Sequence, residues 1–174
     1  MRRILFLFLL VSSFGFAQVK WMSMDAALAA QEKEPRKILL KAYTDWCTNC
    51  KWMDKYAFAK AEIAKYINEN YYPVAFNAEG DEVIHYKGAV YANPFKKRND
   101  RAPHQFASFL KIFEYPTLVF FDEQGTIINP VPGKMDSKKL EIYITMLSDE
   151  TYKSINTGKK WSDYQKNFEY ELQD

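Results

Sequence analysis

The chain has 174 residues, of which 17% are aromatic, and its 24 basic residues nearly balance its 22 acidic residues. This balance argues against nucleic acid or an acidic membrane surface as the main partner, because both favour proteins with a clear excess of basic residues. The length suits one compact domain with a sizeable core, and the aromatic content favours a folded chain over a disordered one.

The first 17 residues have the pattern of a secretory signal. Arg2 and Arg3 precede an apolar run over residues 4–11, and the small-x-small sequence at residues 15–17 predicts cleavage before Gln18. The apolar run is far too short to span a bilayer. We therefore expect an exported protein, periplasmic if its source is Gram-negative, whose mature chain has lost two basic residues and no acidic residue and is nearly neutral.

The next part of the chain predicts a strand, helix and strand after an initial helix. An alanine-rich stretch over residues 21–33 predicts the first helix, which Pro35 ends. Residues 38–43 predict a strand that is buried on both faces, as in the centre of a parallel sheet. An apolar stripe with helical spacing at residues 63–67 predicts a helix, and residues 72–76 predict the second strand.

The second half of the sequence predicts a helix, a β-hairpin and the last helix of the compact domain. Apolar residues recur at helical spacing over residues 104–113, and residues 117–121 predict a strand. A turn sequence joins that strand to residues 126–128, which predicts a β-hairpin. Asp136 predicts the cap of a helix whose inner face lies within residues 140–147.

Two segments of the sequence lie outside these predicted elements of the compact domain. Residues 80–103 form a long polar connection, and its aromatic and basic cluster at residues 86–101 suits either a partner-docking segment or a solvated loop anchored by its tyrosines. Residues 151–174 predict a docked helix, in which Ser162 and Gln165 resemble a capping box. Three aromatic residues share one face of that helix: Trp161, Tyr164 and Phe168.

Both cysteines of the chain lie in the tetrapeptide Cys47-Thr48-Asn49-Cys50, directly after the predicted central strand. At a helix start, unpaired backbone amides and the helix dipole favour the thiolate of the first cysteine, while the second lies one turn inside and can close a disulfide. This spacing favours a reversible redox pair. A structural disulfide is the alternative, although so small a loop stabilises poorly, and a metal half-site is another.

The two histidines do not supply the missing ligands of a metal site. His85 and His104 lie in or beside the long connection and have no metal-binding spacing with the cysteines. We expect both to be solvated or locally bonded surface histidines, and we expect no metal and no cofactor other than the disulfide between Cys47 and Cys50.

The motifs together resemble those of exported bacterial thioredoxin-like proteins. The features that carry the resemblance are the lead-in Tyr43-Thr44-Asp45-Trp46-Cys47 and the tripeptide Tyr115-Pro116-Thr117, and it covers roughly residues 20–149. It implies an α/β thioredoxin-like fold with a central mixed sheet flanked by helices. The expected domains are a signal peptide at residues 1–17, a thioredoxin-like domain at residues 18–150 with an insertion at about 80–103, and a helical extension at residues 151–174.

The resemblance also implies roles for residues outside the cysteine pair. In this family the proline of the tripeptide is cis and faces the disulfide, so Pro116 is a candidate cis-proline. The backbone at Tyr115 would then offer an edge to which an extended substrate segment adds like a strand. Trp46 would face the substrate, with simple packing beside the motif as the alternative.

Lys41 departs from the family pattern. Thioredoxin-like proteins commonly have a buried Asp six residues before the first cysteine, and Lys41 stands at that position. A lysine cannot replace the carboxylate as proton acceptor while it is charged, but close to the sulfurs it would favour thiolate. Alternatively, its stem extends along apolar neighbours until the ammonium reaches water or a carboxylate, which is the interpretation we favour.

The resemblance implies a thiol–disulfide oxidoreductase that acts on protein disulfides or dithiols outside the cytoplasm. Thr48 and Asn49 lack the histidine typical of oxidases and isomerases of this fold, which favours a reductase or electron carrier. Such a role needs an outside electron donor, by resemblance a membrane thiol transporter, and we expect a monomer with no nucleic-acid partner. The alternatives are a disulfide oxidase or isomerase, and a redox-responsive binding module that uses residues 80–103.

Overall fold

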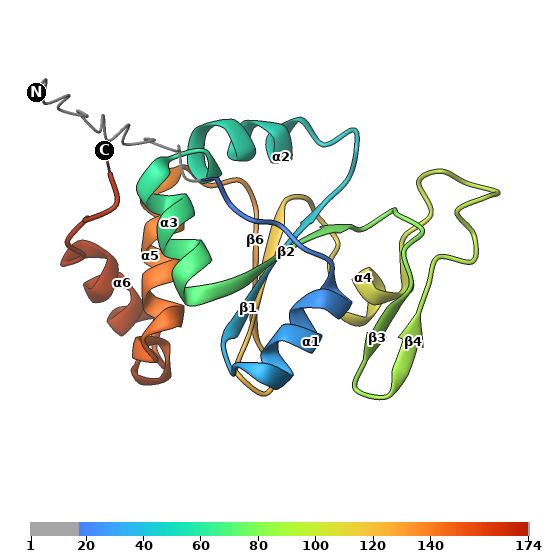
Figure 1. The fold of residues 1–174 in the computed structure, drawn as a ribbon. Helices are drawn as coiled ribbons and strands as arrows, with labels where there is room; N and C mark the ends of the chain where they lie inside the picture. The colour runs from blue at the N-terminus through green and yellow to red at the C-terminus, as the bar shows by residue number, and fades with distance from the viewer. Residues whose placement is uncertain (1–17, 174) are drawn as a thin grey trace, which may run out of the picture.

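The computed structural model describes residues 18–173, which fold as a four-stranded mixed sheet with a covering layer on each face (Figure 1). The secretory signal predicted at residues 1–17 lies outside the described residues. The elements in chain order are α1 (Met24–Lys33), β1 (Lys37–Tyr43), α2 (Thr48–Met53), a π-helical turn η1 (Asp54–Phe58), α3 (Ala61–Asn70), β2 (Tyr71–Asn77), β3 (Ile84–Tyr86), β4 (Ala89–Tyr91), α4 (Gln105–Phe109), β5 (Thr117–Phe121), β6 (Ile127–Pro132), α5 (Ser137–Ser148), a 3₁₀ turn η2 (Thr151–Ser154) and α6 (Gly158–Lys166).

The sheet has the order β2-β1-β5-β6, so the strand that leads into the cysteines lies inside it. Strand β1 pairs in parallel with β2 and antiparallel with β5, and β5 pairs antiparallel with β6. Six of the seven residues of β1 are buried, as expected for a strand covered on both faces. The predicted α/β fold with a central mixed sheet flanked by helices is therefore confirmed.

Alternation along β1 sends its side chains into two cores. Ile38 and Leu40 pack with α1, α4 and the β3–β4 hairpin, whereas Leu39 packs with α2, η1, α3 and α5. Figure 1 shows α1 and α4 on one side of the sheet and α2, α3 and α5 on the other. The cysteine pair at the end of β1 therefore rests on a strand that both cores hold in place.

The insertion at residues 80–103 is partly structured. It contains the hairpin of β3 and β4, in which Tyr86 is buried and Tyr91 packs beside it against Phe106 of α4, with ring centroids 5.6 Å and 5.2 Å from that of Phe106. The tyrosines thus anchor the first part of the insertion to the core. Strands of three residues carry too little periodicity to be predicted from sequence, and the hairpin was missed for that reason.

Two local predictions need correction. Helix α4 is shorter than the predicted span of residues 104–113, and Lys111, which follows its C-cap Leu110, adopts a left-handed φ of 56°. The capping box predicted at Ser162 is wrong, because Thr157 caps α6 and Ser162 lies inside the helix. By contrast, Asp136 caps α5 as predicted, and its side chain accepts the amide of Lys139.

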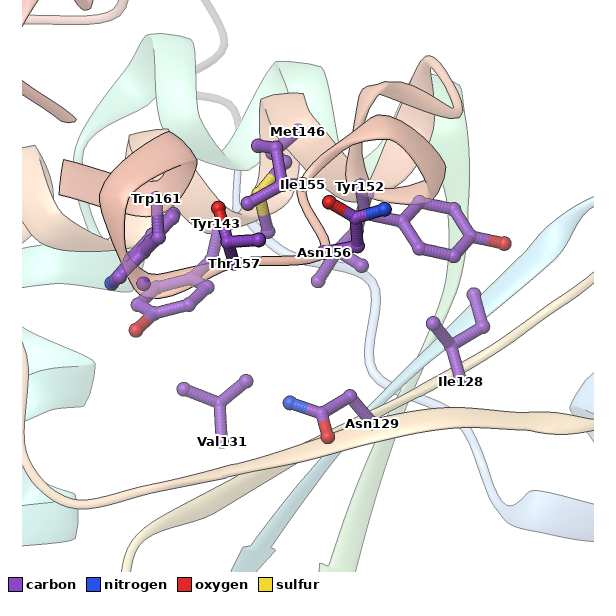
Figure 2. Close-up of a pocket in the computed structure, with 12 residues that line it drawn as sticks. Ile128, Asn129, Val131, Tyr143, Met146, Tyr152, Ile155, Asn156, Thr157 and Trp161 are labelled. Atoms are coloured by element: carbon purple, nitrogen blue, oxygen red, sulfur yellow. The ribbon is translucent and has the colours of Figure 1, made fainter. Parts of the chain in front are cut away.

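The C-terminal extension packs against α5 and leaves a hollow beside the edge strand. The ring of Trp161 lies 5.3 Å from that of Tyr143 on α5, and Tyr164 and Phe168 continue the aromatic row. Figure 2 shows Trp161 and Tyr143 on one side of a hollow of about 560 Å³ and Val131 of β6 on the other. Among residues 18–173, no helix is long and apolar enough to cross a membrane.

Candidate active site

Cys47 and Cys50 form a disulfide at the point where β1 gives way to α2, with 5.3 Å between their Cα atoms. Cys47 is the N-cap of α2, and its Sγ accepts the backbone amide of Cys50 at 3.0 Å. An amide aimed at this sulfur stabilises negative charge on it more than neutral thiol. The geometry thus singles out Cys47 as the sulfur better suited to be a thiolate.

In the disulfide form, solvent exposure does not distinguish Cys47 from Cys50. Cys47 is 3% exposed and Cys50 is 2% exposed, so the helix start does not leave Cys47 open to solvent in this form. The division of labour between them therefore rests on the hydrogen bond to Cys47, not on the accessibility of either residue.

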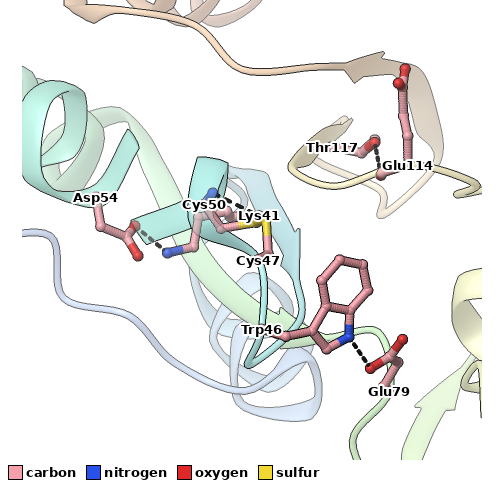
Figure 3. The surroundings of a disulfide bond; sticks show 8 residues. All are labelled: Lys41, Trp46, Cys47, Cys50, Asp54, Glu79, Glu114 and Thr117. Atoms are coloured by element: carbon pink, nitrogen blue, oxygen red, sulfur yellow. Dashed lines mark hydrogen bonds and ion pairs between the residues drawn. A yellow bond between two sulfur atoms is a disulfide. The ribbon is translucent and has the colours of Figure 1, made fainter. Parts of the chain in front are cut away.

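Trp46 stands beside the disulfide and is held by both ends of the insertion. Its side chain points away from Cys47, and its indole Nε1 donates to the Glu79 carboxylate at 2.8 Å (Figure 3). The Arg101 guanidinium lies 5.3 Å from the centre of the indole ring, as in a cation–π contact. Trp46 is nevertheless 51% exposed, so it combines a fixed position with a face that a partner can reach.

The Tyr115–Pro116 peptide bond is cis, as the family resemblance implied. The Tyr115 ring packs edge-on against Trp46 with the centroids 6.1 Å apart, and burial together with the nearby Glu79 carboxylate raises the pKa of Tyr115. Thr117 closes this turn, because its hydroxyl donates to the Glu114 carbonyl at 2.8 Å. The structure thus brings Trp46 and Tyr115 together at the disulfide, while their proposed contact with substrate stays a prediction.

Lys41 lies on β1 beneath the redox helix, and its ammonium pairs with the Asp54 carboxylate (Figure 3). The Lys41 side chain is 5% exposed and that of Asp54 is 46% exposed. The ammonium also lies within 4.6 Å of the Trp21 ring centre and 5.4 Å of those of Tyr43 and Phe58, at the wall of a pocket of about 420 Å³. The lysine therefore follows the route we favoured, along apolar neighbours to a carboxylate.

The remaining predicted residues lie outside this cluster. Thr48 and Asn49 are exposed on the first turn of α2. His85 is exposed and contacts the Asp25 carboxylate at 2.7 Å. His104 is fully buried, which corrects the prediction of a surface histidine: its Nδ1 accepts the Phe106 amide as the cap of α4, and burial lowers its pKa.

Three residues of the site were missed by the sequence reasoning: Asp54, Glu79 and Arg101. Asp54 follows Cys50 by four residues, a spacing that places both on one helical face, and this signal was available. Glu79 and Arg101 reach Trp46 only through tertiary structure. No group of three or more histidine, cysteine or carboxylate side chains that could hold a metal ion occurs in the described part of the chain.

The model of the Thioredoxin-like domain family matches residues 22–147, which include the disulfide and the cis-proline turn. The chain belongs to this family. Among solved structures, a thioredoxin-fold protein from Helicobacter pylori matches with a TM-score of 0.58 and 20% identity, and the match covers 76% of this chain and 81% of the other. A putative disulphide-isomerase from Bacteroides thetaiotaomicron matches with a TM-score of 0.56 and 19% identity over 78% and 97% of the two chains.

Curated proteins are also similar to this chain in sequence. The thiol:disulfide interchange protein DsbD of Cronobacter sakazakii is 29% identical over 116 residues, which are 66% of this chain and 17% of that protein. DsbD of Photorhabdus laumondii is 25% identical over 138 residues, or 78% of this chain and 20% of the relative. The chain thus spans about a fifth or less of these relatives. Family, relatives and disulfide together support a thiol–disulfide oxidoreductase.

Proposed function

We propose that this thioredoxin-like protein exchanges thiols and disulfides with other proteins outside the cytoplasm, mainly as a reductase or electron carrier. The observation that carries the proposal is the disulfide at the start of α2, with the Cys50 amide directed at Cys47 Sγ. A buried, purely structural disulfide would not need its first sulfur at a helix start, where thiolate is favoured.

In the reducing direction the reaction runs in two exchange steps. The Cys47 thiolate attacks one sulfur of the partner's disulfide, a bond forms between the two sulfurs, and the partner's second sulfur leaves as a thiolate that takes a proton from water. Cys50 then loses its proton to water, and its thiolate attacks Cys47 Sγ. The bond between Cys47 and the partner's first sulfur breaks, the internal disulfide is restored, and that sulfur leaves as a thiolate that takes a proton from water. Two electrons pass to the partner, and a dithiol donor must return them to Cys47 and Cys50.

The surroundings of the sulfurs support the reducing direction. Thr48 and Asn49 supply no imidazolium between the cysteines, and the buried ammonium of Lys41 beneath the helix is already paired with Asp54. Without an unbalanced cation, the thiolate and hence the reduced form gain little extra stability. A weakly stabilised dithiol passes its electrons on more readily.

Location and electron donor belong to the same proposal. The signal pattern of residues 1–17 supports export, and periplasmic location if the source is Gram-negative. The likeness to DsbD, a thiol:disulfide interchange protein, supports partners that are themselves dithiol or disulfide proteins. The resemblance to exported thioredoxin-like proteins adds a membrane thiol transporter as the proposed electron donor. The sequence contains no nicotinamide or flavin fingerprint that would replace such a donor.

The reduction potential of the cysteine pair tests the direction. We expect a value near or below that of thioredoxin, about −270 mV, measured by equilibration with glutathione or dithiothreitol buffers. A value close to that of a strong oxidase, about −120 mV, would reverse the proposed direction. A Cys50→Ser variant should retain partners as mixed disulfides through Cys47, and a Cys47→Ser/Cys50→Ser variant is the control that should retain none.

A further inference from the structure

Residues 94–101, here called the basic lobe, concentrate positive charge in an otherwise nearly neutral chain. The stretch contains four basic residues and one acidic residue, and its exposed aromatic residue is Phe95. Lys97 and Arg98 are exposed, and no ion pair joins either of them to a carboxylate among residues 18–173. In Figure 1 the segment between β4 and α4 projects from the molecule on the side opposite α6.

The basic lobe is continuous with the redox site. Its last residue, Arg101, lies over the indole of Trp46, whose chain neighbour is Cys47. The same indole is fixed from the other side by Glu79 at the start of the insertion. A polypeptide that presents a sulfur to Cys47 from the side of Trp46 brings its flanking residues within reach of the lobe.

The base of the basic lobe is tied down. The Asn93 amide donates to three backbone carbonyls, those of Glu79 at 3.5 Å, Gly80 at 3.0 Å and Ala102 at 2.7 Å. Turn hydrogen bonds follow within the lobe, from the amides of Arg98 and Asn99 to the Phe95 carbonyl at 2.9 Å each. Because its ends and first turn are fixed, the lobe presents its charges with little conformational entropy left to lose on binding.

We propose that the basic lobe selects the partners of this protein, and that its occupant is an acidic polypeptide segment next to the partner's reactive cysteines. The inference rests on the proposed exchange at Cys47 and Cys50. Lys97 and Arg98 supply unpaired cations for carboxylates, and Phe95 supplies an apolar contact beside them. Charges of this kind chiefly raise the rate of productive encounter, and they leave the sulfur chemistry unchanged.

Rates of exchange with matched peptides test the proposal. Peptides share one internal disulfide and differ only in a short flank of Glu, Gln or Lys residues, and tryptophan fluorescence follows their oxidation of the reduced protein. We expect the Glu peptide to react about tenfold faster than the Gln peptide at low salt and the Lys peptide to react slowest. The difference should vanish at about 0.5 M salt, where charges are screened within a few ångströms.

Charge reversals locate the effect. Lys97→Glu/Arg98→Glu should abolish the preference for the Glu peptide, whereas Lys159→Glu/Lys166→Glu on α6 makes the same charge change at the far end of the molecule and should keep it. All variants should react equally with uncharged 2-hydroxyethyl disulfide, and thermal unfolding checks that each is folded. That small reagent separates the two proposals, because a failure to oxidise the protein with it would refute the thiol exchange itself.

Other outcomes overturn the assignment of the occupant. Equal rates for the three peptides, or a preference lost equally in the α6 control, would show that the basic lobe does not select acidic partners. Binding to vesicles that contain phosphatidylserine, abolished by Lys97→Glu/Arg98→Glu in the absence of any peptide preference, would assign the lobe to a membrane surface instead.

Discussion

Removing Asp54 should destabilise the protein more than removing Lys41, although each change breaks the same ion pair. The reason is the difference in exposure: Asp54 is 46% exposed and remains hydrated when Lys41 becomes Met, whereas Lys41 is 5% exposed and loses its one carboxylate when Asp54 becomes Ala. Breaking a buried pair from one side costs about 3–5 kcal/mol because the other charge stays buried. Cation–π contacts with three aromatic rings still stabilise the unpaired ammonium and reduce this cost, by about 0.5–2 kcal/mol per contact.

We therefore expect Asp54→Ala to lower the free energy of unfolding by about 1–3 kcal/mol. Lys41→Met keeps the apolar stem and should change it by about 1 kcal/mol or less, in either direction. In urea, with a slope of about 2 kcal/mol per M, a loss of about 2 kcal/mol lowers the midpoint by roughly 1 M. The double variant should resemble Lys41→Met, since no unpaired ammonium remains in it.

The same variants show whether the pair acts on the sulfurs. A paired ammonium contributes little net charge, and the Asp54 carboxylate that Lys41→Met leaves unpaired is 46% exposed and therefore screened by water. Lys41→Met should for this reason leave the reduction potential and the thiolate pKa of Cys47 nearly unchanged. Asp54→Ala uncovers the cation, which favours thiolate and should make the protein more oxidising, by an amount on the order of 30 mV or less. If Lys41→Met proved the more destabilising change and also made the potential clearly more reducing, the lysine charge would act on the sulfurs directly and the reasoning would be wrong.

Three further predictions concern the neighbourhood of the disulfide and the insertion. In the reduced protein, brief alkylation with mass mapping should label Cys47 before Cys50, since one amide stabilises only the Cys47 thiolate; earlier labelling of Cys50 would exchange their roles. Trp46→Phe should cost about 1–3 kcal/mol in urea unfolding because the largely buried Glu79 carboxylate loses its indole donor, and an unchanged midpoint would contradict this. Burial lowers the pKa of His104 below its usual 6.5, so the unfolded chain binds more protons than the folded one and the free energy of unfolding should fall as the pH drops below about 6.5. His104→Asn keeps an acceptor for the Phe106 amide and should flatten that pH dependence. An identical slope in both proteins would refute this.

Most of the sheet could be predicted because its signals are local. The apolar run of β1 and the turn between β5 and β6 identify their strands without reference to the rest of the chain. Asp136 likewise predicts the start of α5 from one side chain. Such features depend on a few neighbouring residues, and the structure keeps them.

The features that sequence reasoning missed depend on residues far apart in the chain. Glu79 directly precedes the insertion and Arg101 lies near its end, and nothing in either position predicts that both reach Trp46. The cap of α6 shows the same limit on a smaller scale. By intrinsic preference Ser162 is the better capping residue, yet Thr157 caps the helix, whose Trp161 packs on α5. The surroundings of Lys41 also had two interpretations until Asp54 was seen beside it.

The arrangement separates the chemistry of the sulfurs from the choice of partner. Cys47 and Cys50 take their properties from one strand end and one helix start, which the two cores hold rigidly. The insertion touches this unit mainly through Trp46. A change at Lys97 or Arg98 in the basic lobe can therefore alter which proteins reach the disulfide while the potential of the pair stays the same. A change at Trp46 or Glu79 should instead affect both, because these residues join the insertion to the redox loop. The insertion is for this reason better tested by point substitutions at Lys97 and Arg98 than by its deletion.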